Sequence, residues 1–309
     1  MGNRLNQSTS SEEICNKFQL EHFGNKVDIF WPSTESSPKE NSFLFLNKLN
    51  DKTLRVLSEK NPIFLIIPPR LEAQVSNLDF GYCISDDPRS VFFQILEYLY
   101  SHLEKSLEDF IDPSAHIGNE VEIGKNVHIS KGCFIEGPCT IGDNVYISPN
   151  CIFLGKVEVG NNCFFSSSVV IGEEALSLRE ENGLHKANLQ IGGVKIGQSC
   201  RLGLKSSVSR GTIEDTQLGN NVHIAENVLI AHNVVVGDNT VITVNTTVCG
   251  SGEVSENCWL GPKSLIMSHV KIPMNTKIAA GAVVHTNIKK PGTYMGNPAK
   301  LLKIKKEKL

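Results

Sequence analysis

A bulky apolar residue returns at every sixth position through most of the last two thirds of this chain, and this period limits what the chain can fold into. The first unbroken series is Ile111, Ile117, Ile123, Ile129, Ile135, Ile141, Ile147, Phe153, Val159, Phe165 and Ile171. The second is Leu218, Ile224, Ile230, Val236, Ile242, Val248, Val254, Leu260, Ile266, Ile272, Ile278 and Val284. A period of six fits neither an α-helix nor an alternating strand. Short strands separated by sharp turns do fit it, with three six-residue faces in each 18-residue coil.

A small residue usually stands four positions after each bulky one, as Val127 does after Ile123. The sequences Gly-Lys-Asn at Gly124 and Gly-Asp-Asn at Gly142 suit sharp corners, because glycine and asparagine favour turn conformations. Successive coils would stack at the ordinary strand spacing of roughly 4.8 Å. The sequence therefore predicts a parallel β-helix, a triangular prism that the bulky and the small residues fill.

The cysteines follow the same pattern. Five of the nine occupy small-residue positions, namely Cys133, Cys139, Cys151, Cys163 and Cys258. Buried cysteine behaves as a small hydrophobic residue, and the chain has no CxxC pair. We therefore predict core residues here and no thiol nucleophile.

The six-residue period is interrupted twice. A polar segment, residues 172–190, separates Ile171 from the next coil, and we expect it to form a loop outside the prism. Ten residues separate Val208 from Leu218, so the phase also shifts within residues 209–217. Repeat proteins place such insertions on one face, which is often the binding face.

Residues 1–109 lack the period and predict a small α/β domain. Ser10 and Glu13 have the spacing of a helix-opening capping box, and residues 42–46 and 63–67 have the composition of strands. An amphipathic helix is expected to begin at Pro88, with an apolar side that runs through Leu103 and Leu107. The predicted organisation is a domain over 1–109, a β-helix over 110–290 and a basic tail over 291–309.

The charge balance excludes several classes of partner. The chain has 30 Lys and Arg against 33 Asp and Glu, a formal net charge of −3, whereas a nucleic-acid-binding surface over the whole molecule needs a strong positive excess. No apolar run approaches the ~18 residues that span a bilayer, and the first residues lack the apolar segment of a secretory signal. We expect a soluble, cytoplasmic protein with no transmembrane segment and no nucleic-acid partner.

Several segments together resemble the UDP-3-O-(3-hydroxyacyl)glucosamine N-acyltransferases of lipid A synthesis, over nearly the whole chain. They are residues 111–115, 191–197, 209–211 and, most specifically, the Ala-His-Asn element within residues 230–234. The resemblance implies a mainly β fold, a left-handed parallel β-helix of hexapeptide repeats behind a small α/β domain that binds a nucleotide sugar. It also implies a homotrimer with sites between subunits. The expected enzyme is an N-acyltransferase of lipid A or surface-polysaccharide synthesis.

The resemblance also implies the substrates and the catalytic residues. The donor would be acyl-CoA or an acyl carrier protein, the acceptor a nucleotide-linked amino sugar, and no metal or permanently bound cofactor is expected. His232 would be the general base, because an attacking amine must lose a proton and imidazole titrates near neutral pH. Gly250, one coil later, would offer its N–H to the tetrahedral oxyanion. His269 would be a second active-site histidine.

Further residues take binding roles by the same resemblance. Those expected to bind the sugar nucleotide are Asn233, Arg210, Glu226, Phe43, Phe45 and Asn47, and those expected to bind the acyl donor are Ala280, Gly281 and Lys300. The chain departs from the family at Ala225, because the family carries a carboxylate there that orients the catalytic histidine. Either the neighbouring Glu226 takes this role or another group does.

Two other functions are compatible with the same fold. A zinc-dependent, carbonic-anhydrase-like enzyme would need three histidines, two of them five residues apart on one chain, and the nearest approach here is His223 and His232, nine apart. A rigid solenoid could also serve as a scaffold or binding surface without catalysis. A metal assay and substrate-binding measurements separate these alternatives.

Overall fold

The computed structural model describes residues 5, 8–101 and 109–302. The chain divides into two compact units, Met1–Ser106 and Leu107–Leu309, close to the boundary expected at residue 109. Among the described residues, no helix combines the length and the apolar character that a membrane-spanning helix needs.

The first unit is an α/β domain around a five-stranded sheet, in the order β2-β7-β6-β5-β4. Its strands are β1 (Thr9–Ser10), β2 (His22–Gly24), β3 (Asp28–Ile29), β4 (Trp31–Pro32), β5 (Ser42–Phe45), β6 (Ile63–Ile67) and β7 (Gly81–Ile84). Its helices are α1 (Ser11–Lys17), α2 (Asp51–Ser58), the 3-10 helix η1 (Pro69–Leu71), α3 (Glu72–Val75) and α4 (Pro88–Leu99). The two strands expected from the sequence are therefore confirmed as β5 and β6.

Two helix predictions in this unit are also confirmed. The Ser10 hydroxyl accepts a hydrogen bond from the Glu13 N–H, and the Glu13 carboxylate accepts one from the Ser10 N–H at 2.8 Å, which is the predicted capping box. Helix α4 begins at Pro88 behind an Asp87 cap and buries Phe92 and Ile95. Its predicted continuation to Leu103 and Leu107 lies outside the described residues.

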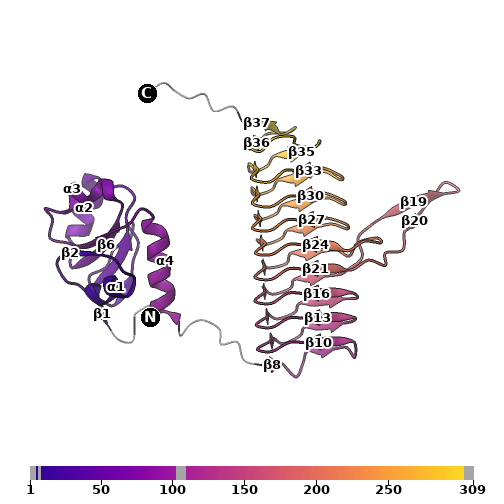
Figure 1. Ribbon diagram of the computed structural model, residues 1–309, viewed down its shortest axis with the longest axis horizontal. Helices are drawn as coiled ribbons and strands as arrows, with labels where there is room; N and C mark the ends of the chain where they lie inside the picture. Colours follow the sequence, from indigo (N-terminus) through magenta and orange to yellow (C-terminus); the bar gives the residue numbers. More distant parts are fainter. Residues whose placement is uncertain (1–4, 6–7, 102–108, 303–309) are drawn as a thin grey trace. The chain divides into compact units, whose positions relative to one another are not determined.

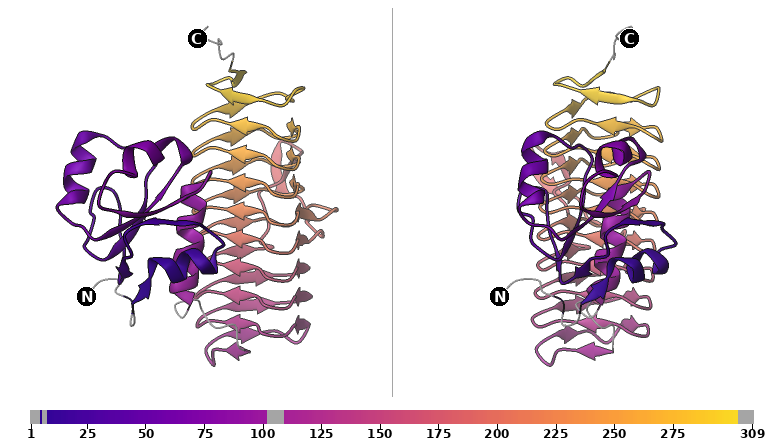
Figure 2. Two further views of the ribbon diagram at one scale, coloured as in Figure 1. Left: turned by 60° about the vertical axis from the view of Figure 1, so that its left-hand side comes forward. Right: turned by 90° about the vertical axis from the view of Figure 1, so that its left-hand side faces the viewer.

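The second unit is a parallel β-helix with three sheets, visible as stacked rungs in Figures 1 and 2. Sheet 1 holds β10 (Val121–Ile123), β13 (Cys139–Ile141), β16 (Val157–Val159), β21 (Val194–Ile196), β24 (Thr216–Leu218), β27 (Val235–Val236), β30 (Glu253–Val254) and β33 (Lys271–Ile272). Sheet 2 holds β8 (Phe110–Ile111), β11 (His128–Ile129), β14 (Tyr146–Ile147), β17 (Phe164–Phe165), β22 (Arg201–Leu202), β25 (His223–Ile224), β28 (Val241–Ile242), β31 (Trp259–Leu260), β34 (Lys277–Ile278), β36 (Thr293–Met295) and β37 (Lys300–Leu301). Sheet 3 holds β9 (His116–Ile117), β12 (Phe134–Glu136), β15 (Ile152–Leu154), β18 (Val170–Ile171), β23 (Ser207–Val208), β26 (Leu229–Ile230), β29 (Thr247–Val248), β32 (Leu265–Ile266) and β35 (Val283–Val284).

The register confirms the 18-residue coil, since Ile129 pairs with Ile147 and Ile135 with Phe153 in neighbouring rungs. From the second coil onward, the bulky residues fill the interior of the prism. All five cysteines assigned to the core are buried, and burial raises the pKa of Cys139 to about 12. Asparagine dominates the corners because it tolerates a positive φ, as at Asn245 (+58°).

Both interruptions of the period lie at one edge of the prism. We call this edge the third corner, defined as the turns that lead from a sheet 3 strand to the next sheet 1 strand. The first insertion leaves between β18 and β21 and forms a hairpin of β19 (Leu178–Glu181) and β20 (Leu184–Ala187), which projects from the stack in Figure 1. The second, residues 209–215, lies between β23 and β24.

The end of the β-helix differs from the expected boundary at residue 290. Strand β36 pairs with β34 in parallel, and β37 pairs with β36 antiparallel, so residues 293–301 extend sheet 2. A stack of parallel strands leaves unpaired N–H and C=O groups at its last edge, and in sheet 2 β36 pairs with this edge of β34. Four lysines of the predicted basic tail, Lys303, Lys305, Lys306 and Lys308, lie outside the described residues.

Candidate active site

The turns of the third corner stack His232, Gly250 and His269 on three successive coils. The Ser251 N–H donates to the His232 carbonyl oxygen at 2.9 Å, which joins the first two turns. The His269 N–H donates to the Gly250 carbonyl oxygen at 3.1 Å, which joins the next. The structure therefore brings these three predicted residues to the same edge of the prism.

The half-buried imidazole of His232 lies across the backbone of Gly250. A Cβ atom added to Gly250 would stand 2.6 Å from Nε2 and 2.7 Å from Cε1 of His232. Gly250 is buried, and within the described part of the chain its N–H donates no hydrogen bond, although the neighbouring N–H groups of Cys249 and Ser251 do. Buried N–H groups are nearly always paired. One without a partner in the described chain is therefore available to donate to a ligand, and the Gly250 N–H is such a donor in the backbone beside the ring.

Asn233 contacts the same imidazole. Its Oδ1 lies 3.0 Å from His232 Nδ1 and also accepts a hydrogen bond from the Thr212 N–H at 3.0 Å. Its Nδ2 donates to the Glu214 carbonyl oxygen at 2.9 Å, and its backbone N–H donates to the Thr216 hydroxyl at 2.8 Å. The turn before β24 therefore fixes Asn233, which in turn contacts His232.

His269 has the backbone conformation that asparagine has at most other corners. Its φ of +62° matches the +59° of Asn233, which lies at the same position two coils earlier. Positive φ is uncommon outside glycine, and histidine is one of the residues that tolerate it. The side chain is exposed at the third corner, and its catalytic role stays a prediction.

Arg210 is turned toward the preceding coils. Its Nε donates to the Gly172 carbonyl oxygen at 2.6 Å, and Nη2 donates to that of Leu154 at 3.4 Å. Gly155 makes this possible, because a Cβ there would stand 2.9 Å from Nη2. Arg210 thus attaches the second insertion to the coils before it, and its predicted contact with substrate stays a prediction.

Asp215 attaches the other end of this insertion. Its carboxylate, with 9% of the side chain exposed, accepts hydrogen bonds from Lys156 Nζ at 2.9 Å and from the Gly193 N–H at 2.8 Å, and it lies 3.5 Å from Lys195 Nζ. Burial acts to raise the pKa of Asp215, but Lys156 and the Gly193 N–H outweigh burial and hold this pKa below its ordinary value.

Asp215→Asn is therefore expected to lower the free energy of unfolding by roughly 1 kcal/mol at neutral pH, because hydrogen bonds to a charged partner become neutral ones. Because folding lowers the pKa of Asp215, its ionised carboxylate stabilises the fold at pH values above the ordinary aspartate pKa of about 3.9. This contribution is lost as the pH falls through the lowered pKa. Urea unfolding should give a wild-type advantage at pH 7 that disappears in acid. Glu158→Gln is the control, since this exposed carboxylate lies 3.6 Å from Lys195. An equal loss in both variants would contradict the assignment.

Three other predicted residues lie away from the third corner. Glu226, Ala280 and Gly281 lie in turns from sheet 2 to sheet 3, which we call the second corner. Glu226 borders a depression of about 250 Å³ with Arg201 and His223. Asn233, and not Glu226, contacts the His232 ring.

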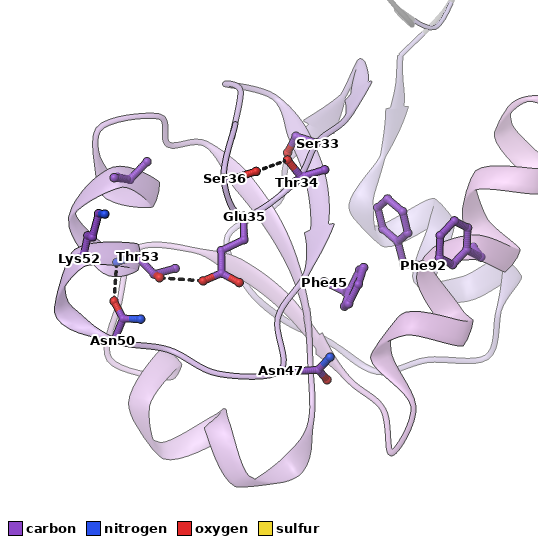
Figure 3. Close-up of a pocket in the computed structure, with 12 residues that line it drawn as sticks. Ser33, Thr34, Glu35, Ser36, Phe45, Asn47, Asn50, Lys52, Thr53 and Phe92 are labelled. Carbon is purple, nitrogen blue, oxygen red and sulfur yellow. Dashed lines mark hydrogen bonds between the residues drawn. The ribbon is translucent and has the colours of Figure 1, made fainter. Parts of the chain in front are cut away.

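The first unit contains a pocket of about 760 Å³ (Figure 3). Of the six residues expected to bind the sugar nucleotide, three lie in this unit, and two of these, Phe45 and Asn47, line the pocket together with Glu35 and Lys52. Figure 3 shows Phe45 facing Phe92, and the two ring centroids are 5.3 Å apart. The third, Phe43, is fully buried in the core, so its side chain offers no surface to a ligand.

No sequence motif predicts the residues that hold the third corner in place, namely Thr212, Glu214, Asp215 and Thr216. The only signal for them was the ten-residue interval from Val208 to Leu218, which located the insertion without assigning partners. Lys300 is exposed in β37 at the end of the stack. Within residues 5, 8–101 and 109–302, no three histidine, cysteine or carboxylate side chains gather as metal ligands would.

The solved structures similar to this chain share the β-helix. UDP-N-acetylglucosamine O-acyltransferase from Moraxella catarrhalis superposes with a TM-score of 0.57 at 24% identity, over 63% of this chain and 74% of that one. UDP-N-acetylglucosamine acyltransferase from Campylobacter jejuni also gives 0.57 at 24% identity, over 63% and 75%. The predicted fold is confirmed as a left-handed parallel β-helix.

Sequence relatives narrow the family further. Residues 138–173 match the family model described as bacterial transferase hexapeptide (six repeats). UDP-3-O-acylglucosamine N-acyltransferase from Albidiferax ferrireducens is 30% identical over 284 residues, 88% of this chain and 81% of the relative. The enzyme of the same name from Janthinobacterium sp. is 28% identical over 130 residues, 42% of this chain and 37% of the relative. This chain therefore belongs to the family of the UDP-3-O-acylglucosamine N-acyltransferases.

Proposed function

We propose that this protein is an N-acyltransferase of lipid A synthesis, which moves an acyl group from an acyl thioester to the amino group of a UDP-linked 3-O-acylglucosamine. The observation that carries this proposal is the His232 ring lying against the backbone of Gly250, whose buried N–H donates no hydrogen bond within the described part of the chain. A base and an oxyanion donor on neighbouring rungs are what direct acyl transfer from a thioester needs.

The proposed reaction passes through one tetrahedral intermediate, which forms between the two substrates and not with a side chain of the protein. The amine nitrogen attacks the thioester carbonyl carbon, and His232 Nε2 takes the proton that the nitrogen loses. The Gly250 N–H donates to the oxyanion of the tetrahedral intermediate. The C–S bond then breaks, the amide forms, and the departing thiolate receives the proton from the imidazolium.

The binding roles are part of the same proposal. The pocket bordered by Phe45 and Asn47 would hold the nucleotide, where an aromatic ring can stack on a base and an amide can hydrogen-bond to its edge. Ala280 and Gly281 lie at the second corner and His232 at the third, so neighbouring chains would each contribute one of these corners to a shared site. This division supports a homotrimer, with acyl-CoA or an acyl carrier protein as donor.

The test is turnover by the purified protein with UDP-3-O-acylglucosamine and acyl-CoA or acylated carrier protein. Thiol release should equal amide formation, measured by mass spectrometry of the sugar product. Phe45→Ala should raise KM for the sugar nucleotide and leave kcat nearly unchanged, because uniform binding is lost. Release of the thiol without formation of the amide would contradict acyl transfer to the sugar. Substrate binding without turnover would indicate a binding protein, and zinc-dependent CO₂ hydration would indicate a carbonic-anhydrase-like enzyme.

A further inference from the structure

We propose that Asn233 is the positioning residue that orients His232 and fixes its proton on Nδ1. The inference rests on the proposed function. It starts from Ala225, where the resemblance implied an orienting carboxylate: this residue has no such group and lies at the second corner. The group found against Nδ1 is instead the Asn233 amide, with its Oδ1 at 3.0 Å.

The hydrogen bonds of Asn233 determine which end of the amide faces the ring. The Thr212 N–H can only donate and lies 3.0 Å from Oδ1, while the Glu214 carbonyl oxygen can only accept and lies 2.9 Å from Nδ2. Flipping the amide would place its NH₂ against an N–H and its oxygen against a carbonyl. The backbone of the second insertion therefore imposes the orientation.

The amide orientation in turn determines the histidine tautomer. An oxygen that accepts from Thr212 has one remaining lone pair, and it can only accept from His232. Nδ1 must therefore carry the hydrogen, so Nε2 of the neutral ring has a free lone pair. Nε2 is also the atom that lies over Gly250. The basic nitrogen thus lies beside the backbone of the residue that would donate to the oxyanion.

Asn233 differs from a carboxylate in having no charge. A neutral amide holds the ring and its tautomer without adding the attraction that a negative charge exerts on an imidazolium. It cannot take the Nδ1 proton, so His232 works as a single base and not as part of a proton relay. Among the charged groups of this corner, Asp215 pairs with Lys156, and Arg210 donates to the carbonyl oxygens of Gly172 and Leu154.

The experiment uses Asn233→Gly, because glycine accepts the φ of +59° and only the amide is lost. In ¹⁵N-histidine spectra of the wild type, neutral His232 should show the Nδ1–H tautomer, with its signal assigned by its absence from His232→Ala. In Asn233→Gly the Nε2–H tautomer should appear, and kcat should fall roughly 10²-fold with little change in KM. Asn245→Gly, a corner asparagine with φ +58° and no side-chain hydrogen bond in the described part of the chain, should change neither.

A second variant, Asn233→Asp, keeps the acceptor and adds the missing charge. The acid limb of its kcat/KM profile should move up by about one pH unit, which a loss of structure alone would not produce. An unchanged tautomer in Asn233→Gly, or the Nε2–H tautomer in the wild type, would overturn the assignment. Lack of turnover by the wild type with every acyl donor would count against the proposed function, and the spectra would still test the tautomer.

Discussion

His232→Ala should lower kcat by roughly 10²–10⁴-fold, the usual contribution of a positioned general base. The remaining rate comes from binding and from the Gly250 N–H, neither of which the substitution removes. Steady-state kinetics with a saturating donor should show the loss in kcat, because the base acts in the transition state and not in the bound substrate complex.

The control for this variant is another partly exposed histidine of the β-helix. His223 on β25 lies 2.9 Å from the Asn221 side chain and is not at the third corner. His223→Ala should keep activity within about threefold, since surface substitutions have small effects. Thermal unfolding should show both variants folded. A loss of less than tenfold in folded His232→Ala would remove this residue as the base.

The β-helix was predictable because each rung repeats the same physical requirement. A bulky residue at one position and a small one four later fill the interior, so the pattern appears twenty-three times in two unbroken series and defines the coil length. That length then places Gly250 directly over His232 from spacing alone. The length of the repeat determines which residues stack in a β-helix, and this length can be read from the sequence.

The features that the sequence did not predict depend on backbone partners. The bond between Asn233 and His232 requires Thr212 and Glu214 to meet the amide, and these lie in the insertion where the period fails. The strand β36 was not predicted either. It pairs with the edge of β34 through backbone N–H and C=O groups, which every sequence has, so no residue pattern marks it. Phe43 and Phe45 are two positions apart and share one face of β5, yet only the structure separates the buried ring from the one that borders the pocket.

Gly250→Ala should lower kcat by about 10²-fold or more, because the new methyl group would displace the imidazole beside it, and a positioned general base contributes on the order of 10²–10⁴. The added Cβ would stand 2.6 Å from His232 Nε2, so the imidazole must leave the position it has over the glycine. Side chains are tolerated at this corner position in the neighbouring coils, where His232 and Ser268 occupy it. The glycine is therefore required by the imidazole and not by the fold.

A double-mutant cycle tests this interpretation directly. If the alanine acts by displacing the ring, Gly250→Ala should cost little further activity when His232 is already alanine, so that the two effects are strongly non-additive. Ser268→Ala, at the equivalent position one coil later, should leave kcat unchanged. Additive losses in the double variant would mean that Gly250 acts independently of His232, for example through the backbone of the turn, and the shared site on neighbouring rungs would no longer hold.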